Sequence, residues 1–194
     1  MVSQILIFLL DTLLGLFSLA LLLRFYMQLV RAPYGNPLSP FLIAVTDFLV
    51  KPARRVIPGY RGMDLATLLL AWIAQVMLLA SVLMLKGYSL SFNSDSTIGG
   101  AAGGLALLGL VEIIKTTLYI IMVAIIIQAV LSWINPYNSL APLLDSFTRP
   151  FLGVIREHIP PIGNIDLSPL FVLIIIQLLL FVTAGMEREV SRLF

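Results

Sequence analysis

Residues 155–169 read IREHIPPIGNIDLSP and lead straight into the apolar run LFVLIIIQLLLFVTAG. The quoted stretch contains a Pro-Pro pair, several charged residues and the only histidine of the chain, His158. In a soluble protein such a segment would suggest a ligand-binding loop. The apolar run that follows is typical of a helix buried in lipid, so the stretch is predicted to be a corner leading into a membrane span.

The same corner occurs 102 positions earlier. Residues 36–79 align with residues 138–181 without a gap, and 14 of the 44 aligned positions are identical. Leucines recur by chance in apolar helices, whereas matched polar residues and prolines are more specific. We therefore predict that the chain is an internal duplication. The matched pairs that carry this prediction are Asn36/Asn138, Pro40/Pro142, Thr46/Thr148, Arg54/Arg156, Pro58/Pro160, Asp64/Asp166 and Gln75/Gln177.

Composition places the chain among integral membrane proteins. Of its 194 residues, 60% are hydrophobic and 11% are charged, and the mean hydropathy is +1.04. Soluble domains carry about 25% charged residues. The net charge of +2 is too small to indicate direct nucleic-acid binding, and the absence of cysteine excludes disulfides and thiolate metal sites. The apolar N-terminus lacks a basic region and a cleavage site, so it is predicted to be a retained helix.

Four segments have the length and composition of membrane spans, since a spanning helix needs about 20 mostly apolar residues. The chain is thus predicted to be an all-α membrane protein. The predicted spans are residues 5–30, 65–85, 116–134 and 167–186.

The two longer connectors, residues 38–57 and 138–159, place apolar residues at helical spacing with charges between them. This pattern predicts amphipathic helices that lie in the membrane interface, with bends near Pro52 and Pro150. Residues 87–104 are rich in turn-forming residues and are predicted to link a first unit, 1–86, to a second, 105–194. The apolar run 98–111 is too short to span, and is a hinge, an interfacial piece or a lead-in to the third span.

Two spans per unit mean that both units start on the same side of the membrane, so the repeats are predicted to be parallel. The interfacial connectors and their flanks contain seven Lys and Arg residues, against four on the other side. The positive-inside rule then places both interfacial helices at the cytoplasmic face of the membrane and both termini at the other face, which is the periplasmic face if the membrane is a bacterial inner membrane.

The corner residues have both structural and binding interpretations. Asp64 and Asp166 precede predicted helices, where an aspartate caps free N–H groups. Arg54 and Arg156 each lie ten residues earlier and either form an ion pair with that aspartate or contact anionic lipid headgroups. We expect the ion pair to fix the corner.

Polar residues inside the spans form a second candidate set. Gln75 and Gln177 lie about 16 Å into their helices by the helical rise, and Gln128 lies inside the third span. They either hydrogen-bond to neighbouring helices or line a pathway. Arg24 aligns near an isoleucine in the second unit. It is expected to snorkel to the surface or to pair with Gln28, Asp64 or a partner's acid.

Catalytic and metal motifs are not found in the sequence. His158 aligns with Val56, so the duplication does not require a histidine. A haem site would need further ligands, and no cofactor or metal is predicted. The chain also contains no nucleophile–histidine pairing and no phosphate-binding loop. An enzyme is therefore not expected.

The corner ARRVIPGYRGMDLA and its counterpart IREHIPPIGNIDLS resemble the YggT/YlmG family of small integral membrane proteins, whose members carry an R-x-x-I-P-P-I-G-x-x-D-x-S-P type corner. The first corner departs from this motif with Gly59-Tyr60-Arg61 in place of Pro-Ile-Gly. The second corner keeps it at Arg156, Ile159, Pro160, Pro161, Ile162, Gly163, Asp166, Ser168 and Pro169.

The resemblance implies an organising role more than catalysis. Bacterial members are linked to cell division, envelope organisation or ionic-stress tolerance, and plastid relatives to nucleoid distribution and cofactor assembly of a membrane cytochrome. The first hypothesis is accordingly an oligomeric, non-enzymatic scaffold or assembly factor that presents its interfacial helices and corners to partner proteins or anionic lipid. The alternatives are an ion or solute pathway using Gln75, Gln177 and Arg24, and a haem-handling assembly protein.

Overall fold

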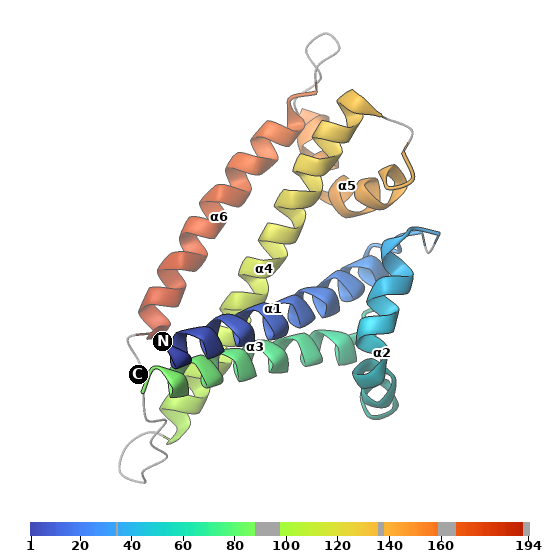
Figure 1. Ribbon diagram of the computed structural model, residues 1–194. Coiled ribbons are helices and arrows are strands. Elements are labelled where there is room, and N and C mark those ends of the chain that lie inside the picture. Colours follow the sequence, from blue (N-terminus) through green and yellow to red (C-terminus); the bar gives the residue numbers. More distant parts are fainter. Residues whose placement is uncertain (34, 88–97, 136–137, 159–165, 192–194) are drawn as a thin grey trace.

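The computed structural model describes residues 1–33, 35–87, 98–135, 138–158 and 166–191. In these ranges the chain forms six α-helices and no strand, which confirms the all-α prediction (Figure 1). The helices are α1 (Val2–Leu29), α2 (Leu38–Val56), α3 (Leu65–Leu85), α4 (Ile98–Ile134), α5 (Ala141–His158) and α6 (Ser168–Ser191).

Four of these helices are long and apolar enough to cross a bilayer, as predicted. They are α1, α3, the Ala102–Ser132 part of α4, and α6, and each contains an 18-residue stretch with a mean hydropathy between 2.3 and 2.5. The two shorter helices, α2 and α5, correspond to the predicted interfacial segments and continue through Pro52 and Pro150.

Of the three alternatives for residues 98–111, the structure confirms the lead-in to the third span, because α4 begins at Ile98. Residues 98–104, placed in the linker above, are helical, and the 37 residues of α4 extend about 55 Å at 1.5 Å per residue. Each glycine in a helix interior costs about 1 kcal/mol relative to alanine, which is why the glycine-rich run looked like a hinge. Just after this run α4 contacts α3, where Trp72 Nε1 donates to the Ala106 carbonyl at 3.0 Å.

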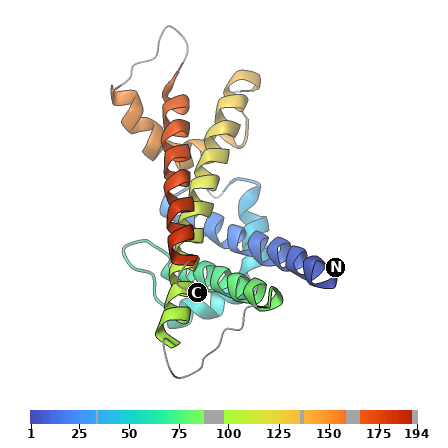
Figure 2. The same ribbon diagram turned by 90° about the vertical axis from the view of Figure 1, so that its left-hand side faces the viewer.

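The spans associate as two pairs. Helix α1 packs along α3 and α4 packs along α6, while α3 also contacts α4. Figures 1 and 2 show the α1–α3 pair running obliquely to the α4–α6 pair. Gly109 of α4 lies at the crossing, where an added Cβ would come within 2.6 Å of Val76 Cγ2. The small residue therefore sets how closely the two pairs approach each other.

One hydrophobic cluster joins both halves of the chain. Leu21, Leu22 and Val50 are fully buried in it, and Phe147 of α5 joins them. The rings of Tyr26 and Phe147 lie 6.4 Å apart. A smaller cluster around Ile125 is confined to α4, α5 and α6. Because α5 contributes to both clusters, the amphipathic helices are fixed parts of the fold.

An ion cluster joins α4 to the C-terminal part of α6. Lys115 Nζ lies 3.0 Å from Glu112 Oε1 and 3.0 Å from Glu187 Oε2. The cluster depends on a contact between residues 115 and 187, which lie far apart in the chain and are brought together only by folding.

Candidate functional site

The same local turn starts both amphipathic helices. Asn36 Oδ1 accepts hydrogen bonds from the Leu38 and Ser39 amides, both at 3.0 Å. Asn138 Oδ1 accepts one from the Leu140 amide at 2.9 Å. Each asparagine also donates through Nδ2 to the carbonyl three residues earlier. An asparagine is suited to this place because its short amide satisfies free backbone groups at a helix start.

The first corner is closed by a tight turn. Tyr60 and Met63 exchange backbone hydrogen bonds of 3.0 and 2.9 Å. Between them Arg61 and Gly62 have φ values of 49° and 85°. Positive φ at both central positions is the signature of a type I′ turn, which glycine favours. The turn returns the chain to the end of α2 and so sets the start of α3.

The turn brings Asp64 against Arg54, as the sequence predicted. Asp64 Oδ2 accepts hydrogen bonds from Arg54 Nε at 3.0 Å and Nη2 at 2.5 Å. Asp64 Oδ1 caps α3 by accepting from the Thr67 amide at 3.3 Å, and the Thr67 hydroxyl also donates to Asp64. Both the predicted cap and the predicted ion pair are confirmed.

The second corner contains the matching pair in a more exposed setting. Arg156 Nε and Nη2 lie 2.9 and 2.7 Å from Asp166 Oδ2. The Asp166 side chain is 36% exposed, compared with 3% for Asp64. The corner predictions for Pro160, Pro161 and Gly163 fall outside the described residues, and Pro58 is exposed at the surface.

Local interactions lower the pKa of both corner carboxyls. Burial raises the pKa of Asp64, but hydrogen bonds from Arg54 and Thr67 outweigh it and hold the pKa below the usual 3.8. At Asp166 burial is again opposed, here by hydrogen bonds from Ser168 and Arg156, and the pKa is likewise lowered. Both carboxyls are therefore ionised at neutral pH.

Acid should weaken the first corner. A lowered folded-state pKa means that Asp64 contributes stability above the unfolded-state value of about 3.9, and this contribution is lost as pH falls through the folded-state pKa. We expect the melting temperature to drop more steeply below pH 4 in the unaltered protein than in the Asp64→Asn variant. Equal slopes for the two proteins between pH 5 and pH 3 would contradict this assignment.

Arg24 pairs with Asp47, a partner that was not predicted from the sequence. Its Nη1 donates to Thr46 Oγ1 at 2.6 Å and lies 2.9 Å from Asp47 Oδ1. Lys51 Nζ lies 2.8 Å from the other oxygen, Oδ2. Hydrogen bonds from Lys51 and Arg24 lower the pKa of Asp47. The expected pairing of Arg24 with Asp64 or Gln28 is therefore wrong. The Arg24 side chain is only 12% exposed, so it does not snorkel into the solvent either.

Gln128 occupies in the second half the place that Arg24 occupies in the first. Thr148, the counterpart of Thr46, donates through its hydroxyl to Gln128 Oε1, and both threonines also donate to the carbonyl four residues earlier. From the sequence, Arg24 aligned near an isoleucine of the second unit, and this structural correspondence corrects that alignment. Arg24 lies 12 positions before Asn36, whereas Gln128 lies only 10 positions before Asn138. The counterpart of Arg24 is therefore shifted by two positions from the offset of 102 that relates the two halves.

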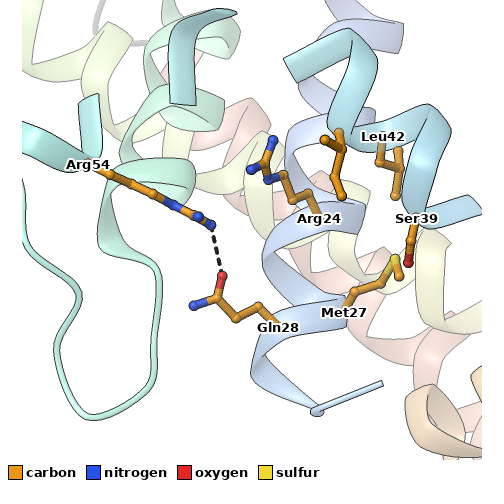
Figure 3. Close-up of a pocket in the computed structure, with 7 residues that line it drawn as sticks. Arg24, Met27, Gln28, Ser39, Leu42 and Arg54 are labelled. Carbon is orange, nitrogen blue, oxygen red and sulfur yellow. Dashed lines mark hydrogen bonds between the residues drawn. The ribbon is translucent and has the colours of Figure 1, made fainter. Parts of the chain in front are cut away.

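A pocket of about 260 Å³ lies between α1 and α2 (Figure 3). The guanidinium groups of Arg24 and Arg54 line it from the two helices, and Arg54 Nη2 donates to Gln28 Oε1 at 3.0 Å. The remaining lining residues are Met27, Ser39, Leu42 and Ile43. Gln28 was missed as a lining residue, although its spacing of four from Arg24 on α1 places the two on one helix face.

The corresponding pocket in the second half is smaller and has no cation. It measures about 120 Å³ and is lined by Gln128, Leu131, Ser132, Asn138, Ala141 and Leu144. Arginine remains protonated in proteins, so the two guanidinium groups of the first pocket can bind an anion but cannot act as bases. The arrangement favours anion binding over proton transfer, and in the first half only.

The remaining candidates are placed apart from this pocket. Gln75 is buried on α3, at 6% exposure. Gln177 is exposed on α6, with Nε2 3.6 Å from Met122 Sδ. His158 is exposed at the end of α5, with Nδ1 2.8 Å from the Val154 carbonyl. The two repeat-matched glutamines therefore have different surroundings.

Comparison with known proteins assigns the family. The model of the CCB3/YggT family matches residues 3–85 and 107–186. Protein PA0392 of Pseudomonas aeruginosa is 37% identical over 194 residues, covering 95% of this chain and 94% of that protein. Protein YggT of Escherichia coli K12 is 30% identical over 173 residues, covering 89% and 85%.

A shorter relative matches one part of the chain. The ycf19 protein of Porphyra purpurea is 32% identical over 73 residues, which are 36% of this chain and 77% of that protein. No solved structure matches the chain. With most of its length matched by the family model and by relatives of at least 30% identity, the chain belongs to the CCB3/YggT family.

Proposed function

We propose that the protein is a non-enzymatic scaffold or assembly factor of a bacterial inner membrane, with α2 and α5 at the cytoplasmic face. The observation that carries this proposal is the pair of amphipathic helices held between the spans. Leu42, Thr46 and Val50 of α2 are buried, as are Phe147 and Leu152 of α5. The buried faces fix the helices, and their outer faces are left free to contact partners.

The outer faces combine charge with exposed apolar residues. On α2, Phe48 is 67% exposed and lies near the exposed Lys51 and Arg55. On α5, Val154 is 57% exposed, and Arg149 is also exposed. Apolar residues beside Lys and Arg suit a helix at the boundary of headgroups and acyl chains, where it meets the cytoplasmic ends of other membrane proteins.

Site-specific photo-crosslinking in membranes tests the scaffold role. Crosslinkers at Arg55 and Arg149 are expected to form adducts with the same membrane protein, or with a second copy of this chain. A crosslinker at Met77, which is 56% exposed on α3, is the matched control for a surface that faces lipid. Adduct formation at Met77 equal to that at both helix positions would contradict a dedicated partner surface.

An ion-flux assay separates the scaffold proposal from the pathway hypothesis. A scaffold tolerates Gln75→Leu combined with Gln177→Leu, because these residues lie away from α2 and α5. If the double replacement abolished ion flux into proteoliposomes and left crosslinking at Arg55 and Arg149 unchanged, the scaffold proposal would be wrong and a pathway would take its place.

A further inference from the structure

We propose that the pocket between Arg24 and Arg54 is the headgroup site of one bound anionic phospholipid, whose acyl chain lies along α1. The inference rests on the proposed function only in placing α2 at the membrane surface. It names a ligand class, a location and a stoichiometry of one lipid per chain.

The charges around the pocket favour an anion. Arg24, Lys51 and Arg54 are opposed by Asp47 and Asp64, so three cations face two carboxylates and one positive charge remains. Neither aspartate lines the pocket, whereas both arginines do. The carboxylates therefore orient the guanidinium groups without covering the cavity.

Both arginines keep hydrogen-bond donors for a ligand. The contacts of Arg24 with Thr46 and Asp47 use Nη1. Those of Arg54 with Asp64 and Gln28 use Nε and Nη2. A guanidinium has five N–H donors in a planar fork that matches the oxygens of a phosphate, and charge-assisted bonds of this kind are strong.

The depth of the pocket matches a lipid headgroup. Arg24 lies five residues before the end of α1, which is about 8 Å at the helical rise. This distance places the guanidinium close to the boundary between the apolar span and the aqueous face. Soluble anions reach such a position less readily than a phosphate already held in the membrane surface.

An apolar groove continues from the pocket. It has a volume of about 290 Å³ and lies between α1 and α2, and Leu42 lines both the pocket and the groove. Along α1 the groove runs from Leu23 to Leu13, about 15 Å into the span. A pocket with two cations at one end and an apolar groove at the other fits an anionic molecule with an acyl chain.

The second half provides an internal comparison. Gln128 stands where Arg24 stands in the first half, and its pocket is lined by uncharged residues. The duplicated fold is thus expected to bind the anionic lipid at one of its two related pockets. Two equally tight lipids per chain would overturn the proposal.

Native mass spectrometry of the delipidated protein in detergent tests the headgroup contact. Titration with phosphatidylglycerol is expected to give one retained lipid per chain, and phosphatidylcholine should bind at least about tenfold more weakly. Arg24→Gln, which installs the second-half residue, should weaken phosphatidylglycerol binding about tenfold. Arg149→Gln removes the same charge from an exposed position on α5 and should change binding less than about twofold.

A second pair of variants tests the acyl groove and leaves both arginines in place. Val45→Trp fills the groove and should weaken lipid binding, whereas Ala44→Trp on the exposed side of α2 should not. If Arg24→Gln prevents folding, the comparison of Val45→Trp with Ala44→Trp still tests whether the lipid binds in this groove. Equal loss with Arg24→Gln and Arg149→Gln, equal binding of phosphatidylcholine, or displacement of the lipid by glycerol 3-phosphate at equal concentration would each overturn the proposal. None of these results bears on crosslinking at Arg55 and Arg149.

Discussion

Replacing Asp64 by alanine is expected to lower the free energy of unfolding by about 3 kcal/mol. The carboxylate is 3% exposed, receives two N–H groups from Arg54 and caps α3 through the Thr67 amide. Loss of a helix cap costs about 1 kcal/mol, and loss of charge-assisted hydrogen bonds about 2 kcal/mol. Reversible unfolding in mixed micelles, followed by circular dichroism, measures the change.

The second corner is the matched control. Asp166 forms the same ion pair but is 36% exposed, and exposed pairs contribute about 1 kcal/mol or less. Asp166→Ala should therefore destabilise the protein much less than Asp64→Ala. Asp166→Arg should be partly rescued by Arg156→Asp, because the swap restores the pair. Equal losses at the two corners, or no rescue by the swap, would show that the pairs do not fix the corners.

Replacing Gly109 by alanine is expected to destabilise the protein by about 2 kcal/mol. The new Cβ would lie 2.6 Å from Val76 Cγ2 and 3.1 Å from Trp72 Nε1. Valine is branched at Cβ and cannot turn away freely, so α3 and α4 must separate. Separation also strains the hydrogen bond from Trp72 to the Ala106 carbonyl. The melting temperature and the α3–α4 distance from paired spin labels report the effect.

Gly103 provides the control on the same helix. An added Cβ there meets nothing within 4 Å, so Gly103→Ala should be neutral or stabilising by up to about 1 kcal/mol, through helix propensity alone. The same substitution is thus expected to destabilise the protein at position 109 and not at position 103. Destabilisation by both would mean that α4 needs flexibility at its glycines, not close packing against α3.

Residue patterns in the sequence predicted the features that depend on neighbours in the chain. Runs of apolar residues predicted the four spans, because bilayer thickness fixes their length. The spacing of ten residues between Arg54 and Asp64, repeated at Arg156 and Asp166, predicted both ion pairs. In the first corner the turn at residues 60–63 returns the chain from the end of α2 to the start of α3.

The features that were missed or left open depend on contacts between distant segments. Arg24 meets Asp47 because α2 folds back across α1, and the repeat concealed this pair because Asp47 aligns with Arg149. The early start of α4 was only one of three alternatives, because its glycines oppose helix formation locally, whereas the contact from Trp72 on α3 comes from a distant segment. Sequence spacing alone does not show that α2 crosses α1 or that α4 crosses α3.

Side-specific labelling tests the central claim most directly, which is that α2 and α5 lie at the same face of the membrane. The chain contains no cysteine, so Arg55→Cys, Arg149→Cys and Lys86→Cys can be made singly without a background. An impermeant maleimide applied to vesicles of known orientation should label Arg55→Cys and Arg149→Cys from the cytoplasmic side only, and Lys86→Cys from the opposite side only. Labelling of the first two positions from opposite sides would contradict the parallel arrangement and the shared surface built on it.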